Sequence, residues 1–223
     1  MICHQEIQHL YHWHNLELQH SKTEYTCDGC KERGWGTRYR CEECNYDLHK
    51  SCALVTPTMF HSFYQNCFFE FHENAKGQRY CNACGKDVLG FAYHCSETGY
   101  DLHPCCATLP RVLQGDNVEL HLCESLLTSC GKCRGKELFG KIKGWSYKST
   151  GKGHHFHVSC VKEMVIEAEM NNFTMEITKV PNLRVGGKAK GKARCWKIVK
   201  IILKFAISIA IGDAAGIANL IGH

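Results

Sequence analysis

The sequence predicts a tandem array of very small modules followed by one hydrophobic helix, rather than a single large domain. Three observations support this prediction: a high content of cysteine and histidine, an internal repeat of 54 residues, and a change of composition after residue 170. The chain of 223 residues contains 17 cysteines and 15 histidines. Modules of about fifty residues bury too little apolar surface to be stable alone, so cross-links must hold each one together.

Cysteine at this density indicates either disulfides in a secreted chain or metal sites in a reducing compartment. The N-terminal sequence has no uninterrupted apolar segment and no small-residue cleavage site, so we expect no secretory signal. Histidines also share the spacing pattern of the cysteines. We therefore expect a cytoplasmic protein whose cysteines are thiolate ligands.

The repeat extends to about residue 170. In the first copy the candidate ligands are Cys27, Cys30, Cys41, Cys44, His49 and Cys52. In the second copy, 54 residues later, they are Cys81, Cys84, Cys95, His103 and Cys106. A degraded third copy keeps Cys130, Cys133, His157 and Cys160, with Ser149 and Lys152 at the places of Cys41 and Cys44. His14 precedes the first copy, and Cys67 precedes the second copy in a similar local sequence.

The chemistry of these ligands favours Zn²⁺. Four nitrogen and sulfur ligands close a tetrahedral zinc site, and a Cys-x2-Cys turn lets two thiolates bind the same ion. Structural zinc contributes an apparent binding free energy of about 10–16 kcal/mol, more than so small a core could supply. Metal is therefore expected to replace most of the hydrophobic core.

Two runs of sequence resemble the divergent C1 (DC1) modules of plant proteins, especially those similar to VACUOLELESS GAMETOPHYTES. These runs are YRCEECNYDLHKSCA and FAYHCSETGYDLHPCCATLP. The resemblance implies small α+β modules, each with short strands and one short helix held by two interleaved zinc sites. It places the modules at residues 7–62, 63–115 and, in degenerate form, 116–170.

The resemblance also implies ligand sets. In the first copy one site would comprise Cys27, Cys30, His49 and Cys52, and the other His14, Cys41, Cys44 and His61. The second copy would bind zinc through Cys81, Cys84, His103 and Cys106. The third copy would keep one site, with Cys130, Cys133, His157 and Cys160 as ligands.

A fifth site is possible in the second copy, but its ligand set is incomplete. Cys67 and Cys95 are present, but Thr98 stands where a thiolate belongs. The spacing leaves three residues that could complete the site, namely His94, Cys105 and Asp116. We therefore expect four zinc ions, with a fifth if this site is complete.

For function, these patterns favour a protein-interaction or signalling adaptor with an unidentified protein partner. We expect no enzymatic activity and no small-molecule substrate, because the chain lacks nucleophile and nucleotide motifs and zinc claims its Cys/His pairs. A diacylglycerol-binding C1 module is an alternative, but only ten residues separate Cys30 from Cys41, and Thr37 stands where such modules have glutamine. A PHD-like chromatin reader is a second alternative, although the repeat needs Cys81 and Cys84 for the second copy.

The C-terminal part carries most of the positive charge. Residues 171–223 have a net charge of +7, against −2 for the rest, so a nucleic-acid surface on the modules is not expected. Residues 171–194 are predicted to form a basic linker, and residues 195–222 a hydrophobic, amphipathic helical tail. Residues 188–211 are expected to bind an anionic membrane surface, which makes the protein peripheral on a membrane. A nuclear localisation signal and packing of the tail on the modules are the alternatives.

Overall fold

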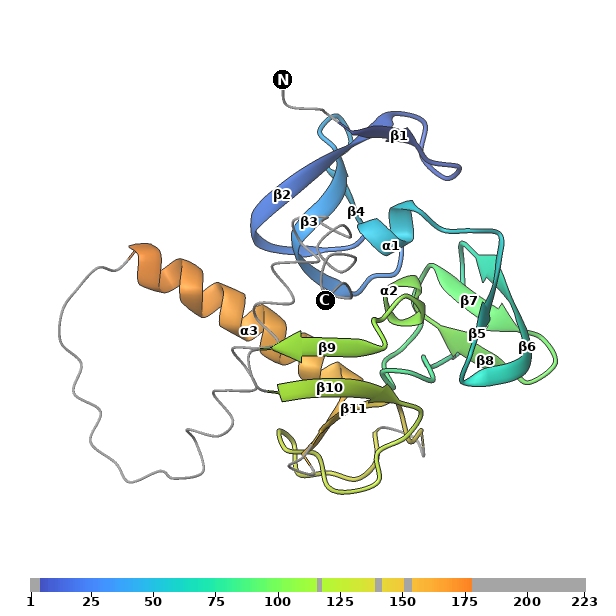
Figure 1. Cartoon of the computed structure of the whole chain (residues 1–223). Coiled ribbons are helices and arrows are strands. Elements are labelled where there is room, and N and C mark those ends of the chain that lie inside the picture. Colours follow the sequence, from blue (N-terminus) through green and yellow to red (C-terminus); the bar gives the residue numbers. More distant parts are fainter. Residues whose placement is uncertain (1–4, 116–117, 139–141, 151–153, 178–223) are drawn as a thin grey trace, which may run out of the picture.

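The computed structural model describes residues 5–115, 118–138, 142–150 and 154–177 (Figure 1). These residues form three four-stranded antiparallel sheets, each with its strands in chain order. The prediction of small strand-rich modules is thus confirmed. The predicted tail, residues 195–222, lies outside the described residues, as do residues 178–194 of the predicted linker.

The first sheet contains the longest strands. Its elements are β1 (Glu6–Gln8), β2 (Asn15–Thr26), β3 (Arg33–Cys41) and β4 (Tyr46–His49), followed by α1 (Lys50–Ala53). Tyr39 of β3 lies opposite Leu48 of β4, and both side chains are fully buried. Such a cross-strand pair on the covered face stabilises a small sheet.

The second sheet repeats this arrangement. Its elements are β5 (Thr58–His61), β6 (Tyr64–His72), β7 (Ala92–Cys95) and β8 (Tyr100–Leu102), followed by α2 (Pro104–Ala107). The pair Tyr93 and Leu102 takes the place of Tyr39 and Leu48. The agreement between sequence repeat and strand register shows that one supersecondary unit occurs twice.

The third sheet ends in a much longer helix. Its elements are β9 (Val112–Gly115), β10 (Val118–Cys123), β11 (Ser146–Ser149) and β12 (His155–His157), followed by α3 (Val158–Ile177). In Figure 1, α3 runs from this sheet past the first module. Because α3 continues to Ile177, the prediction that the linker begins at residue 171 is wrong.

The first strands of the second and third sheets lie before the predicted module boundaries. β5 pairs with β6, and β9 pairs with β10, so residues 58–61 and 112–115 belong to the module that follows them. Neither strand carries a ligand of the repeat, apart from the predicted ligand His61. The spacing of the ligands therefore could not indicate where each sheet begins.

The second and third modules share one hydrophobic core. Trp145, which is fully buried, donates a hydrogen bond from its indole N–H to the Tyr64 hydroxyl at 3.1 Å. The Tyr147 hydroxyl donates to the Pro110 carbonyl at 2.8 Å. The core cluster around these residues runs from Cys67 to Met164 and so contains residues of both modules. Neither module is packed as an independent unit.

The first module has its own core, which includes one buried side chain of the second module and has Phe71 and Cys105 of that module packed against it. Phe91 is buried in the cluster that contains Leu16, Tyr39 and Leu48. The Phe91 backbone N–H donates to the Gly29 carbonyl at 2.9 Å. A Cβ atom at Gly90 would lie 2.1 Å from the same carbonyl oxygen, so only glycine allows this approach.

We predict that Gly90→Ala separates the first two modules and destabilises the zinc-loaded protein. Backbone must move to accommodate the methyl group, at a cost of about 1–3 kcal/mol. Thermal unfolding of the full chain measures the effect. Gly135→Ala is the control, because its new Cβ would meet its nearest neighbour at an ordinary 3.5 Å. Equal melting temperatures for both variants would contradict this account of the contact.

Candidate metal centres

The first Cys-x2-Cys pair of each module lies in the same tight turn. The residue after the second cysteine has a positive φ in all three modules: Lys31 (62°), Gly85 (72°) and Arg134 (65°). Its N–H donates to the carbonyl of the first cysteine, at 2.9, 2.7 and 2.9 Å respectively. Lys and Arg rarely adopt this conformation, which indicates that the turn is imposed by the surrounding structure.

The turn is anchored to the strand that carries the histidine. In the first module the Asp28 N–H donates to the Asp47 carbonyl at 2.7 Å, two residues before His49. The equivalent bonds join Asn82 to Asp101 and Gly131 to His155, each at 2.8 Å. Backbone hydrogen bonds therefore hold the thiolate pair beside the imidazole before any metal is considered.

The last cysteine of each group lies in the first turn of the following helix. His49 and His103 are the residues immediately before α1 and α2, and His157 ends β12 immediately before α3. One helical turn brings Cys52, Cys106 and Cys160 back toward these imidazoles. The short helices thus have a positional role, which is to return one thiolate to the ligand group.

The structure brings three predicted ligand sets together. They are Cys27, Cys30, His49 and Cys52; Cys81, Cys84, His103 and Cys106; and Cys130, Cys133, His157 and Cys160. The donor atoms of each set lie within 4.8 Å of one another. In every set the histidine Nδ1 is 3.4 Å from the second cysteine of the turn. Tetrahedral zinc requires about 3.5–3.8 Å between ligand atoms, so the three sets fit Zn²⁺.

The charge state of the sulfurs also suits a divalent cation. Hydrogen bonds from Cys106 and Cys81 hold the pKa of Cys84 well below its usual range. A hydrogen bond from Cys160 lowers the pKa of Cys130 to about 4. In the same groups, hydrogen bonds raise the pKa of Cys106 and of Cys160, so each group holds one ready thiolate beside thiols that lose their protons when zinc binds.

The imidazole nitrogen that faces away from each site is Nε2, and its hydrogen-bond partner differs between the modules. His49 Nε2 lies 3.2 Å from the Arg33 carbonyl, and His103 Nε2 lies 3.0 Å from the Asp87 carbonyl. An N–H that donates to these carbonyls leaves Nδ1 free to bind metal. His157 Nε2 is buried and has no hydrogen-bond partner within the described part of the chain.

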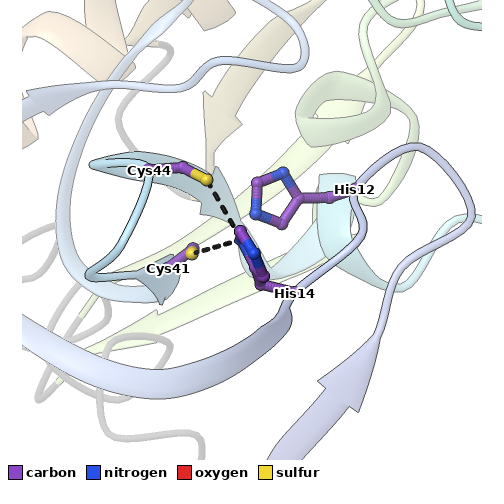
Figure 2. A group of neighbouring side chains, drawn as sticks. All are labelled: His12, His14, Cys41 and Cys44. Carbon is purple, nitrogen blue, oxygen red and sulfur yellow. Dashed lines mark hydrogen bonds between the residues drawn. The ribbon is translucent and has the colours of Figure 1, made fainter.

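A fourth group lies at the surface of the first module and comprises His12, His14, Cys41 and Cys44 (Figure 2). His14 Nδ1 lies 3.1 Å from Cys44 Sγ and 3.7 Å from Cys41 Sγ. The His12 ring stacks on Tyr46, and its buried Nε2 has no partner among the described residues. An orphaned imidazole nitrogen beside two thiols and a second imidazole is the donor set that zinc prefers.

The prediction of His61 as the fourth ligand of this group is wrong, because His12 occupies that position. His61 lies on β5 of the second sheet and stacks on Trp145, with ring centroids 4.4 Å apart. Its Nδ1 accepts a hydrogen bond from the Phe63 N–H. Burial, aided by Arg111, lowers the pKa of His61 to about 4, so the ring is a neutral packing residue.

The equivalent site of the second module keeps its turn but only two of its ligand residues. Gly99 has a φ of 71°, and its N–H donates to the Cys95 carbonyl at 2.8 Å, as in the turns described above. Cys67 Sγ lies 3.3 Å from the Thr98 hydroxyl, and Cys67 and Cys95 also interact with each other. Within the described residues, no third metal-binding side chain joins these two cysteines.

The three residues considered for this fifth site do not complete it. His94 Nδ1 is hydrogen bonded to the Asp101 carboxylate at 3.0 Å. Cys105 lies near Cys30 and Cys106, at the junction of the first two modules. Asp116 lies outside the described residues. In the third module, Ser149 accepts a hydrogen bond from the His154 N–H and has no metal-binding neighbours in the described part.

A lysine from α3 joins the first module to a metal group of the second, which the sequence did not indicate. Lys162 Nζ lies 2.9 Å from the Glu32 carboxylate, 3.4 Å from Cys105 Sγ and 3.8 Å from Cys106 Sγ. A site of three thiolates and one imidazole carries a net negative charge when zinc is bound, and a buried ammonium group offsets it. α3 therefore supports the metal group of the second module as well as that of the third.

We predict that the purified full chain carries four zinc ions, as measured by native mass spectrometry or elemental analysis under reducing conditions. Each of the four groups supplies four donors, and binding free energy is folding free energy in such modules. Replacing Cys27 by Ala should unfold the first module. Two or fewer zinc ions in the folded protein would contradict the assignment, and five would require a metal at Cys67 and Cys95.

We also predict that His12→Ala lowers the zinc content by one ion, whereas His61→Ala leaves four. The second variant loses a stacking contact, so it should instead lower the melting temperature, by an amount equivalent to about 1 kcal/mol. The two single-histidine variants are controls for each other. The reverse pattern of metal loss would restore His61 as a ligand.

The comparisons with known proteins agree with this geometry. Residues 10–53 match the family model described as the C1 domain. "Probable nucleoredoxin 1" of Arabidopsis thaliana is 45% identical over 54 residues, which are 24% of this chain and 9% of that protein. No solved structure gives a significant match. Residues 10–53 are thus similar to a C1 domain, and the four ligand groups of the tandem C1-like modules fit Zn²⁺.

Proposed function

We propose that this protein is a zinc-stabilised adaptor that binds a protein partner and attaches to an anionic membrane surface. The observation that carries the proposal is the closure of the four metal groups. Each has four protein donors, so none leaves a coordination position for a substrate or an activated water. Zinc in these groups has a structural role, and the modules present surfaces rather than reactive centres.

The loop between β1 and β2 is the best candidate for the partner surface. Leu10 is 86% exposed and Trp13 is 90% exposed. Both are held by rigid neighbours, since His9 Nε2 lies 3.2 Å from the Cys52 carbonyl and His12 and His14 belong to the surface metal group. A preorganised, exposed tryptophan is typical of residues that dominate binding free energy at protein interfaces.

The membrane contact rests on the sequence of residues 188–211, which combine basic side chains with an apolar run. Each basic residue near an anionic lipid surface contributes about 1 kcal/mol. Lys200 and Lys204 interrupt the apolar run, which favours a helix lying on the surface over one that crosses the bilayer. In the described part of the chain, no helix has the length and apolar character needed to cross a membrane.

The structure supports the earlier argument against diacylglycerol binding by the first module. Residues 33–41 all belong to β3, which pairs with β2 on one side and β4 on the other. This pairing leaves no open loop between the two Cys-x2-Cys turns to form a groove for a glycerol group.

We therefore predict that a fluorescent phorbol ester shows no saturable binding to the zinc-loaded full chain. The reason is the continuous strand pairing of residues 33–41. Fluorescence anisotropy measures the binding, with a diacylglycerol-responsive C1 protein as the positive control. Binding at micromolar concentration would support the lipid-sensing alternative.

To test the partner surface, proximity labelling in cells should compare the wild-type chain with Trp13→Ala. We expect the variant to lose a subset of labelled neighbours while it retains four zinc ions. Phe60→Ala is the matched control, because Phe60 is 71% exposed on the second module. If both variants label the same neighbours as the wild type, the β1–β2 loop is not the partner surface.

To test the membrane contact, the full chain should float with liposomes that contain anionic lipid and not with neutral ones. High salt should release it, because the attraction is electrostatic. A variant with Lys197, Lys200 and Lys204 changed to Glu should not float, whereas changing Lys148 on β11 to Glu should have no effect. A chain that fails to float at low salt would exclude the membrane proposal.

A further inference from the structure

A cavity of about 480 Å³ lies where the three modules meet. Its lining comes from β2, β3 and α1 of the first module, the segment after α2, and β9, β11 and α3. This volume is within the range of about 300–1,000 Å³ that is typical of small-molecule sites. One wall of the cavity comes from Arg33, Gly34, Trp35 and Thr37 of the paired strand β3, and the other walls come from α1 and from the second and third modules.

Most of the lining is apolar. Leu54, Leu109, Leu113 and Val165 supply aliphatic groups, and several aromatic rings, including that of Trp35, complete the wall. Leu54 is 49% exposed, so part of the apolar lining is in contact with solvent. Such a surface binds apolar ligands because it gains free energy when water leaves it.

The charged residues of the lining all have the same sign. Arg33, Lys50 and Lys162 line the cavity, and no aspartate or glutamate does. Arg33 pairs with Glu24, and Lys162 pairs with Glu32. The side chain of Lys50 has no ion pair or hydrogen bond with any residue that the structure describes. The cavity therefore has an apolar wall and one uncompensated positive charge.

We propose that this cavity binds a free single-chain anionic amphiphile, that is, one carboxylate or phosphate group on an apolar body. Lys50 pairs with the anionic group, and the aliphatic wall covers the chain. A neutral ligand of the same length leaves Lys50 without a partner, and a cationic one is repelled. Residues 171–223 of the chain itself are unsuited as the occupant, because they have nine Lys or Arg residues against two acidic ones and the cavity is also positively charged.

Binding here joins the modules, because the ligand would contact residues of all three. It is also independent of the partner contact proposed above, since the β1–β2 loop does not line the cavity. A ligand that binds only the assembled form raises the melting temperature of the protein as its concentration rises.

The test uses the zinc-loaded full chain and three probes of equal chain length: dodecanoate, dodecanol and dodecyltrimethylammonium. Isothermal titration calorimetry below the critical micelle concentrations should show one dodecanoate per chain, with dodecanol at least tenfold weaker and no saturable binding of the cation. Affinity should rise about fourfold for each methylene added between octanoate and dodecanoate. Equal affinity for dodecanoate and dodecanol, or no saturable binding of dodecanoate, would overturn the proposal.

Two variants locate the site. Lys50→Gln should weaken dodecanoate about tenfold and leave dodecanol unchanged, whereas Lys148→Gln, on the exposed face of β11, should change neither. Val165→Trp fills the cavity and should abolish binding of both probes. Zinc content measured on each variant shows that the modules remain folded. Dodecanoate affinity that survives Val165→Trp in protein with four zinc ions would place the ligand elsewhere and overturn the assignment.

Discussion

The convergence of a thiolate pair, an imidazole and a further thiolate on one point is the interaction on which this structure depends. In each module a tight turn aims two sulfurs, a strand end aims the imidazole, and one helical turn returns the last sulfur. Backbone hydrogen bonds from the turn to the neighbouring strand set these positions. Helices of only four residues, such as α1 and α2, are too short to be stable by themselves. They are placed where the site requires a ligand, and metal binding supplies the free energy that they lack.

The modules nevertheless do not pack as independent units. The second and third modules share a core around Trp145, and Phe91 of the second module completes the core of the first. α3 adds a third connection through Lys162, which reaches Glu32 of the first module and two sulfurs of the second. Loss of zinc from one module should therefore destabilise the neighbouring modules. The same assembly creates the cavity that none of the modules could form alone.

The incomplete site of the second module shows that the backbone turn is retained where a ligand is missing. Around Thr98 the backbone turn is unchanged, although the second thiolate is missing and a hydrogen bond to Cys67 has replaced the metal contact. The turn is satisfied by its own backbone bonds, so it does not need the ion. A site can thus lose its metal while the sheet around it keeps its shape, provided that the neighbouring core is large enough. The second module meets this condition because it shares its core with the third.

The sequence by itself determined the repeat and the preference of its cysteines and histidines for zinc, and its resemblance to DC1 modules implied three of the four ligand groups. The repeat is visible because each Cys-x2-Cys turn and each His-x2-Cys strand-to-helix junction places two donors within a few residues of each other. Only the tertiary structure decided the fourth group, in which His12 replaces His61. Both histidines lie outside the repeat, and β5, which carries His61, pairs with β6 of the second sheet and carries the ring away to Trp145. The roles of Lys162 and of the cavity were also decided in three dimensions, since the groups involved are joined by packing between modules, and sequence spacing carries no information about that packing.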